Sequence, residues 1–129
     1  MICCSIRRSI VARAAEKLGE EAIREKYDAR SLGYRQLFDP ATGFIRGKDE
    51  NGEFRSEEFD PFMWGRDYTE GSVWQNGFGV YHDIKGLDEL YEGHLSEKID
   101  ELMAAPPIYD VGSYGRVIHE MAELSSANY

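Results

Sequence analysis

The apolar positions near the start of the chain repeat at helical spacing. They are Ile6, Ile10, Val11, Ala14, Ala15 and Leu18. Gly19 then stands where such a helix would end. A second amphipathic run ends at Asp39-Pro40, because the residue before a proline is pushed out of the helical region. Its apolar face comprises Ala22, Ile23, Tyr27, Tyr34, Leu37 and Phe38. Two helices with so short a connection predict a helical hairpin.

Turn-forming residues dominate the stretch that follows. Asn51-Gly52 lies between Phe44-Ile45 and Phe54, an arrangement that predicts a short β-hairpin. Beyond it, Thr69 or Ser72 is a candidate cap for a further helix. That helix is expected to run through Val73, Trp74, Phe78 and Tyr81. Its glycines disfavour it by propensity, so burial would have to hold it.

Three more helical segments complete the pattern. One covers Gly86 to Tyr91 and stops at Gly93, and one covers Leu95 to Met103 and stops at Pro106-Pro107. The last is expected from about Tyr114. Its apolar side would carry Val117, Ile118, Met121 and Leu124. The fold class is therefore mainly α, and residues 1–129 are expected to form a single partial domain, since both ends of the pattern are abrupt.

Charge and composition narrow the function. The 129 residues are 42% hydrophobic and carry a net charge of -9, which would repel a phosphate backbone, so no nucleic acid is expected as a partner. No apolar run is long enough to span a membrane. No signal peptide is expected either, since Arg7, Arg8 and Arg13 interrupt the N-terminal apolar positions. Cys3 and Cys4 are adjacent, which gives neither a disulfide framework nor metal-ligand spacing.

The candidate chemistry lies between residues 54 and 83. Eight of the sixteen aromatic residues are here: Phe54, Phe59, Phe62, Trp64, Tyr68, Trp74, Phe78 and Tyr81. Polar side chains alternate with them: Asp60, Arg66, Asp67, Glu70, Gln75, Asn76, His82 and Asp83. Aromatic faces pack against the C–H face of a pyranose, and the polar groups hydrogen-bond its hydroxyls, so the mixture suits sugar binding.

Glu70 is the candidate general acid. A carboxyl group among aromatic rings loses solvation, its pKa rises, and it can protonate a glycosidic oxygen at neutral pH. The alternative is that Glu70 only stabilises the first turn of the next helix. Structural alternatives stay open for its neighbours as well: Trp64 and Trp74 as core residues, Arg66-Asp67 as a surface ion pair, and His82-Asp83 as a polar pair at a helix end.

Two segments contain residue types found in metal sites but lack the spacing that a zinc or calcium site requires. His119-Glu120 lacks the second His of a zinc helix, which would stand at Glu123. The acidic stretch from Asp49 to Glu53 is too short for a calcium hand.

Several motifs together resemble a known family. The segment YTEGSVWQNGFGVYHDIKGLDEL is similar to one in the α-mannosidases of glycoside hydrolase family 92. So are YRQLFDPATGFIRGKDENGEF and FDPFMWGRDYTEG upstream, and YGRVIHEMAEL downstream. The resemblance runs from about Tyr27 to Tyr129. The sequence departs from the family pattern at Ser72, Asn76 and Tyr81. These departures concern which glycosidic linkage and which sugar the enzyme accepts, and they leave the expected fold unchanged.

The resemblance implies a fold and a chemistry. The chain would be helical hairpins from part of an (α/α)6 barrel, with a short β-hairpin insertion and without the family's N-terminal β-sandwich. The activity would be hydrolysis of α-mannosides in glycans by an inverting, calcium-dependent exo-α-1,2-mannosidase. Glu70 would be the general acid. The expected substrate-binding residues are Trp74, Gln75, Trp64, Arg66, His82 and Asp83.

The same resemblance sets expectations for the rest of the parent enzyme. Its general base and calcium ligands would follow Tyr129, so this chain alone would hold no metal and be inactive. The expected partners are a mannose-containing glycan, the remainder of the enzyme and other copies through exposed apolar faces. The parent would be extracellular or periplasmic. Two alternatives stay open: a non-catalytic helical module that binds carbohydrate or protein, and a barrel with a different glycosidase specificity.

Overall fold

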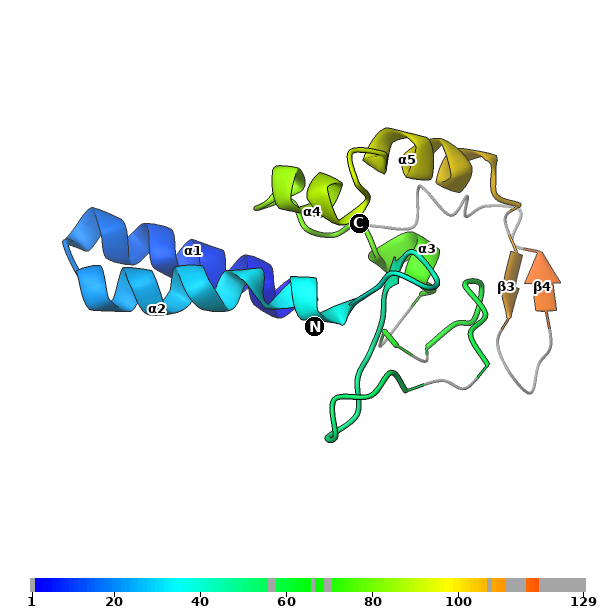
Figure 1. Ribbon diagram of the computed structural model, residues 1–129, viewed down its shortest axis with the longest axis horizontal. Helices are drawn as coiled ribbons and strands as arrows, with labels where there is room; N and C mark the ends of the chain where they lie inside the picture. The colour runs from blue at the N-terminus through cyan, green and yellow to red at the C-terminus, as the bar shows by residue number, and fades with distance from the viewer. Residues whose placement is uncertain are drawn as a thin grey trace.

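The computed structural model describes residues 2–55, 58–65, 67–68, 71–106, 108–110 and 116–118. Its elements are α1 (Ile2–Leu18), α2 (Glu21–Ser31), the 3-10 helix η1 (Leu32–Leu37), β1 (Phe38–Asp39), β2 (Phe44–Ile45), α3 (Val73–Asn76), α4 (Ile84–Leu90), α5 (Leu95–Ala104), β3 (Ile108–Asp110) and β4 (Arg116–Ile118). The α1–α2 hairpin extends away from the body that the other elements form (Figure 1).

The predicted helical hairpin is present, and Gly19 makes its turn. Gly19 has a φ of 74°, a left-handed conformation that glycine adopts without strain. The N–H groups of Gly19 and Glu20 donate to the carbonyls of Glu16 and Ala15, at 3.2 and 2.9 Å. This pattern satisfies the last carbonyls of α1 and reverses the chain into α2.

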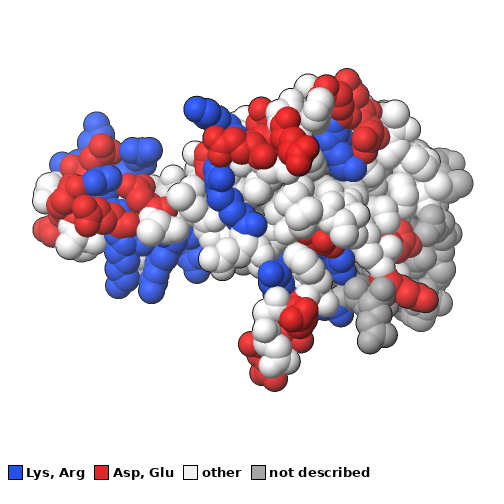
Figure 2. Space-filling view, in the orientation of Figure 1, with Lys and Arg blue, Asp and Glu red and all other residues white. Residues whose placement is uncertain are grey.

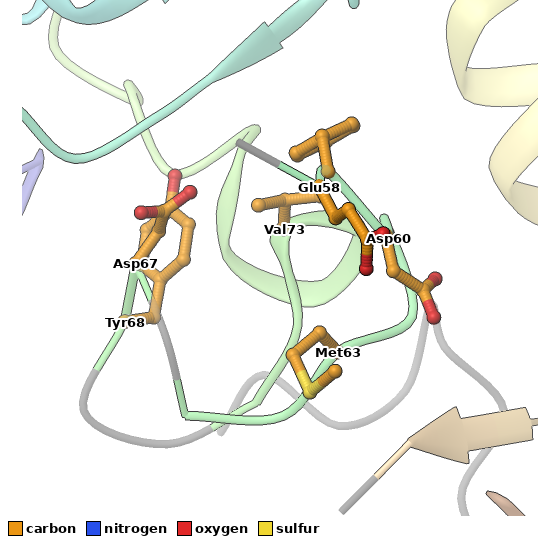
Figure 3. A pocket seen from close by; sticks show the side chains of 7 residues that line it. Glu58, Asp60, Met63, Asp67, Tyr68 and Val73 are labelled. Carbon is orange, nitrogen blue, oxygen red and sulfur yellow. The ribbon is translucent and has the colours of Figure 1, made fainter. Parts of the chain in front are cut away.

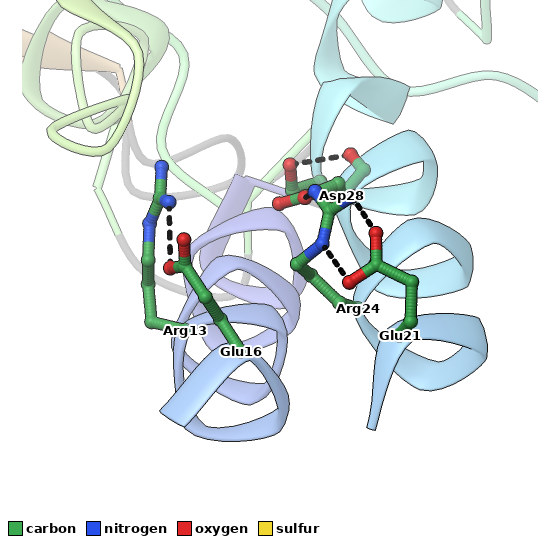
Figure 4. Close-up of polar contacts among 6 residues, drawn as sticks. Arg13, Glu16, Glu21, Arg24 and Asp28 are labelled. Carbon is green, nitrogen blue, oxygen red and sulfur yellow. Dashed lines mark hydrogen bonds and ion pairs between the residues drawn. The ribbon is translucent and has the colours of Figure 1, made fainter. Parts of the chain in front are cut away.

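Small side chains pack between the two helices of the hairpin, and surface ion pairs form within each helix. Ser5, Ala12 and Ala15 of α1 are buried, at 2%, 1% and 5% exposure. On α2, Arg24 pairs with both Glu21 and Asp28, while Arg13 pairs with Glu16 on α1 (Figure 4). Exposed pairs of this kind add little stability, so close packing of small residues is the main contact between the helices.

Several of the larger apolar residues of the hairpin are exposed. Ile10 is 63% exposed and Leu18 77% exposed, and on α2 Ile23 is 43% exposed. Exposed apolar faces were expected on this chain, and self-association through them stays a prediction. Amphipathic spacing shows which positions are apolar, but here the α1–α2 contact uses the smaller residues on another side of the helix.

The second helical run changes geometry before it ends. The α-helix stops at Ser31, and η1 continues to Leu37 as a tighter 3-10 helix. The expected end before Asp39-Pro40 is confirmed. Residues 40–43 then turn the chain so that β1 and β2 pair antiparallel, Phe38 with Ile45 and Asp39 with Phe44.

Across the turn at Asn51-Gly52, Phe54 pairs with a different segment from the expected one. Phe44-Ile45 pairs with β1, while Phe54 forms a single antiparallel bridge with Lys48. Asp49 shapes this tip, because its Oδ1 accepts from the N–H groups of Asn51 and Glu53 at 2.8 and 3.0 Å. The turn signal was correct, but local sequence cannot specify which strand pairs across it.

The helices α3, α4 and α5 are present as the sequence predicts, but their ends differ from the predicted ones. α3 ends at Asn76, and its expected continuation through Phe78 and Tyr81 is wrong, in keeping with Gly77 and Gly79 just beyond it. α4 begins at Ile84, because Asp83 caps it by accepting from the Gly86 N–H at 3.0 Å. α5 ends at Ala104, ahead of Pro106.

The expected last helix is wrong over residues 116–118. These residues form β4, which pairs antiparallel with β3 so that Tyr109 lies opposite Val117. Val117 and Ile118 are β-branched and favour extended backbone, which the helical spacing concealed. The rest of that expected helix, including Met121 and Leu124, lies outside the described residues.

The body contains two clusters of buried side chains. One joins Tyr34, Ile45, Val80, Leu87 and Leu95, and the other joins Phe44, Val73 and Trp74. Tyr68 and Phe78 pack against both clusters, which connects them. Within the described ranges, no helix has the length and apolar character that crossing a membrane requires.

Candidate functional site

A small hollow with a volume of about 10 Å³ lies between residues 58–63, residues 67–68 and Val73. Its lining consists of Glu58, Phe59, Asp60, Met63, Asp67, Tyr68 and Val73. Figure 3 shows Asp67 and Tyr68 on one wall and Glu58 and Asp60 on the other. Acidic and aromatic side chains therefore meet at this hollow, as expected for the stretch that precedes α3.

Asp67, which lines the hollow, belongs to a chain of three buried ionic side chains. The Arg46 guanidinium donates to Asp39 Oδ2 at 2.6 Å, and its Nε lies 3.9 Å from Asp67 Oδ2. All three residues are less than one-tenth exposed. The guanidinium also stacks on two rings, with its carbon 4.5 Å from the centre of Phe59 and 5.2 Å from that of Phe54. The Arg46 guanidinium is therefore the shared cationic partner of two carboxylates, and aromatic rings surround it.

Asp39 is the better satisfied of the two carboxylates. It also accepts from the Thr42 hydroxyl at 2.9 Å and the Ala41 N–H at 3.0 Å. Burial alone would raise the pKa of Asp39, but the hydrogen bonds from Arg46, Thr42 and Ala41 outweigh burial and lower it. Asp39 therefore stays ionised and holds Arg46 in place.

Asp67 packs tightly against the backbone of the segment that follows β2. A Cβ atom placed on Gly47 would lie 2.9 Å from Asp67 Oδ1, so only a glycine leaves room for this carboxylate. The neighbouring Tyr68 hydroxyl donates to the Ile45 carbonyl at 2.9 Å. Asp67 and Tyr68 are thereby both fixed to the β2 region. Sequence reasoning considered Asp67 but missed Arg46 and Asp39 as its partners.

The start of α3 is fixed by its own contacts. Gly71 has a φ of 79°, and its carbonyl accepts from the Gly65 N–H at 3.1 Å. The Ser72 N–H donates to Gln75 Oε1 at 2.9 Å, while Asn76 Nδ2 donates to the Ser72 carbonyl at 3.2 Å. Gln75 is only 2% exposed. In the described structure it thus stabilises the N-terminus of α3, and its substrate-binding role stays a prediction.

The two tryptophans differ in exposure. Trp74 is buried at 7% exposure and meets Phe44 edge-to-face at 4.7 Å between ring centres. Lys98 Nζ lies 4.8 Å from the Trp74 ring centre and 4.5 Å from that of Phe44. Trp64 is 39% exposed. Trp74 therefore belongs to the core in this structure, whereas Trp64 presents part of its surface.

His82 and Asp83 contact a different part of the chain. The Ser31 carbonyl accepts a hydrogen bond from His82 Nε2 at 3.0 Å, and the Tyr34 hydroxyl donates to Asp83 Oδ2 at 2.8 Å. These contacts join α4 to the end of α2 and to η1. The described partners of His82 and Asp83 are thus structural, and a role in substrate binding stays a prediction for both.

Two predicted site residues, Glu70 and Arg66, lie outside the described residues. Within the described ranges, no three His, Cys, Asp or Glu side chains are arranged to hold a metal ion. The calcium requirement of the parent enzyme stays a prediction.

Negative charge dominates part of the surface. On the face in Figure 2, acidic side chains gather over α4 and α5, whereas the α1–α2 hairpin carries both signs. This distribution accompanies the net charge of -9. It agrees with a neutral ligand such as a sugar better than with a polyanion.

The fold and these motifs have clear counterparts among known proteins. The chain matches the glycosyl hydrolase family 92 catalytic domain over residues 4–123. The match begins earlier than the resemblance found from the motifs, because it takes in most of α1. No curated protein matches the sequence.

Solved mannosidase structures are also similar. The family GH92 α-mannosidase BT3965 from Bacteroides thetaiotaomicron is 34% identical with a TM-score of 0.72, over 79% of this chain and 14% of that chain. The complex of the same mannosidase with mannoimidazole is 31% identical with a TM-score of 0.71, over 78% of this chain and 14% of that chain. The inverting mannosidase BT2199 from Bacteroides thetaiotaomicron VPI-5482 is 43% identical with a TM-score of 0.67, over 88% of this chain and 16% of that chain.

These matches assign the chain to a class of glycoside hydrolases whose catalytic domain is helical. The chain belongs to glycosyl hydrolase family 92. Its mainly helical fold with a short β-hairpin agrees with the (α/α)6 barrel of the family's catalytic domain. It spans no more than 16% of the length of the mannosidases it resembles.

Proposed function

We propose that this chain is a segment of the catalytic domain of an inverting α-mannosidase and that Glu70 is its general acid. The observation that carries the proposal is the match to the family's catalytic domain over residues 4–123. The 43% identity to a chain described as an inverting mannosidase supports both the substrate class and the stereochemistry. The mannoimidazole complex of BT3965 supports recognition of a mannose-like ring.

The proposed chemistry divides between this chain and the remainder of the enzyme. Inversion requires one carboxylic acid that protonates the leaving oxygen and one carboxylate that activates water from the opposite face of the sugar. Glu70, in the Tyr-Thr-Glu-Gly motif, supplies the proton. The general base lies beyond Tyr129, so neither Asp60, Asp67 nor Asp83 takes that role, and the isolated chain does not hydrolyse mannosides.

Substrate contacts and the cofactor are part of the same proposal. Trp64, Arg66, Trp74, Gln75, His82 and Asp83 line or support the sugar site. The parent enzyme requires calcium, held by residues outside this chain, and acts in the periplasm or outside the cell. Incubation with EDTA and readdition of calcium tests the metal requirement of the full-length enzyme.

The general-acid role is tested by Glu70→Gln in the full-length enzyme that contains this segment. Loss of a general acid lowers kcat on an α-1,2-linked mannobiose by about 10²- to 10⁴-fold. Glu53→Gln is the matched control, because Glu53 is exposed at the tip beside Asn51 and Gly52. This control should keep the kcat of the wild-type enzyme.

The substrate class is tested with the same protein. The wild-type enzyme should cleave α-mannosides and leave α-glucosides and α-galactosides uncut. Undiminished hydrolysis by Glu70→Gln contradicts the acid role. Cleavage of another α-glycoside in place of mannosides supports the different specificity, and binding of mannose without hydrolysis supports the non-catalytic module.

A further inference from the structure

The chain contains two Asn-Gly pairs, Asn51-Gly52 and Asn76-Gly77. An asparagine followed by a glycine is chemically reactive, because the glycine nitrogen can attack the asparagine side chain and no Cβ atom on the glycine hinders the approach. In sequence the two pairs are the same dipeptide, so the sequence gives no reason for one to react before the other. The structure places them in very different surroundings.

The reaction at such a pair replaces the side-chain amide by a carboxylate. Hydroxide removes the proton of the glycine N–H, and the nitrogen forms a bond to the asparagine Cγ. The bond between Cγ and the amide nitrogen breaks, and that nitrogen takes up protons from water and leaves as ammonia. Water then opens the cyclic imide at either of its carbonyl groups, which gives aspartate or isoaspartate.

Asn51-Gly52 lies at the tip of a turn that projects from the body (Figure 1). Residues 49–53 are all exposed. Gly52 has a φ of 86°, and its N–H donates to the Asp49 carbonyl at 3.2 Å. Asp49 Oδ1 accepts from Asn51 and Glu53, and the Asp49 N–H donates to the Glu53 carbonyl at 2.8 Å. These contacts join residues of the turn to one another, so the turn can open without disturbing the core.

Asn76-Gly77 lies at the end of α3, beside a buried cluster. The Gly77 N–H donates to the Val73 carbonyl at 2.7 Å, and Gly77 is buried. The Asn76 side chain donates to the Ser72 carbonyl at 3.2 Å. Val73 and Trp74 of the same short helix belong to the cluster that contains Phe44. Ring closure at Asn76 therefore requires α3 to unwind and its packing against the core to be lost.

We propose that Asn51 is a site of spontaneous deamidation and that the fold protects Asn76 from the same reaction. Ring closure rotates the backbone of the asparagine until the next nitrogen meets Cγ, so the hydrogen bonds around the pair must open first. Local opening costs almost no free energy in exposed turns and approaches the free energy of global unfolding in the core. The reaction needs only water and hydroxide, so the inference does not depend on the proposed function.

Deamidation changes the turn in which it occurs. Asp49, Glu50 and Glu53 already place three carboxylates at this tip, and the product adds another. Like charges so close together repel one another. Isoaspartate also inserts a carbon atom into the main chain, which displaces the Gly52 N–H from the Asp49 carbonyl. The modified turn is therefore more negative and less ordered than the original one.

The test compares the two pairs within one sample of the folded full-length enzyme that contains this segment. The enzyme is incubated in mildly alkaline heavy-oxygen water, which labels each carboxylate as it forms, and is then digested with trypsin in ordinary water. Cleavage after lysine and arginine releases the pairs on separate peptides, residues 49–55 and 67–85. Mass spectrometry with fragmentation should show that Asn51 gains the label at least about tenfold faster than Asn76.

The same enzyme in concentrated urea is the matched control. Without the fold, the two pairs should gain the label at similar rates, because the dipeptide is the same in both. Equal rates in the folded enzyme, faster labelling of Asn76, or an unlabelled Asn51 over a period in which the urea sample reacts would each overturn the proposal. A difference between the pairs that persists unchanged in urea would overturn it too, because the fold would then not be its cause.

Discussion

Removal of the Arg46 charge gives a prediction whose magnitude follows from the buried ionic chain. Arg46→Met keeps an unbranched apolar stem against Phe54 and Phe59 but leaves Asp39 and Asp67 without their shared cation. Breaking a buried ion pair by removing one partner costs about 3–5 kcal/mol. Because a domain of this size is stable by only about 5–15 kcal/mol, the variant should be close to unfolding.

The same three charges predict how much of the lost stability Asp67→Asn restores in the Arg46→Met variant. Asp39, Arg46 and Asp67 together carry one net negative charge, and the Arg46–Asp67 contact is the longer one at 3.9 Å. Asp67→Asn alone should therefore cost about 1 kcal/mol or less. In the Arg46→Met background, Asp67→Asn should restore about 1–2 kcal/mol, because it removes an unpaired buried charge.

Urea unfolding followed by tryptophan fluorescence measures these differences. Trp74 is buried beside Phe44 and should shift its emission when the core opens. Linear extrapolation then gives the free energy of unfolding for the wild type, both single variants and the double variant. A cost below about 1 kcal/mol for Arg46→Met, or no restoration in the double variant, would refute the account of the ionic chain.

Three further predictions concern the backbone, a buried phenol and the exposed apolar faces. Gly71→Ala should destabilise the chain by about 1–2 kcal/mol or more, because its φ of 79° disfavours a side chain and its Cβ would meet Asn76 Nδ2 at 2.5 Å; an unchanged midpoint in urea would contradict this. Burial, then the hydrogen bond to Asp83, raises the pKa of Tyr34 from 10.0 to about 12, so its contribution is full below pH 10 and is lost as pH rises toward 12. The stability difference between wild type and Tyr34→Phe should therefore shrink by about 2–3 kcal/mol over that range, and a constant difference would argue against it. The isolated chain should self-associate in light scattering through residues such as Ile10, Leu18 and Met103, and Ile10→Glu with Leu18→Glu should reduce its mass; a monomer with no exposed apolar surface by dye binding would oppose this.

Local signals in the sequence were enough to predict much of the helical pattern. Gly19 marked the turn between α1 and α2, Asp39-Pro40 marked the end of the second run, and Pro106-Pro107 marked the end of α5. Each of these residues restricts the backbone at its own position, so no distant contact has to be known. The family resemblance drawn from the motifs is confirmed by the match to the catalytic domain.

The remaining features depend on contacts between distant positions. The partner of β2 is β1, and the strand at 116–118 pairs with β3, and neither choice is visible in a local pattern. Arg46 and Asp67 are 21 positions apart, so nothing near either residue shows that they meet. Similarly, the spacing of Ile10 and Leu18 indicated an amphipathic helix but not which elements cover its apolar face.

The candidate site was predicted in composition more than in arrangement. Acids and aromatics do meet at the hollow, as the sequence suggested, but Trp74 is in the core and Gln75 stabilises the start of α3. An aromatic or amide side chain near a motif looks the same in sequence whether it faces a ligand or the interior. Only packing distinguishes these cases.

The stereochemistry of the released sugar tests the central claim most directly. Proton NMR of the full-length enzyme with an α-1,2-linked mannobiose should show β-mannose as the first product, before mutarotation, because inversion proceeds in a single displacement. The Glu70→Gln variant should release no mannose on the same timescale. First appearance of α-mannose, or unchanged release by Glu70→Gln, would contradict the claim that Glu70 is the general acid of an inverting α-mannosidase.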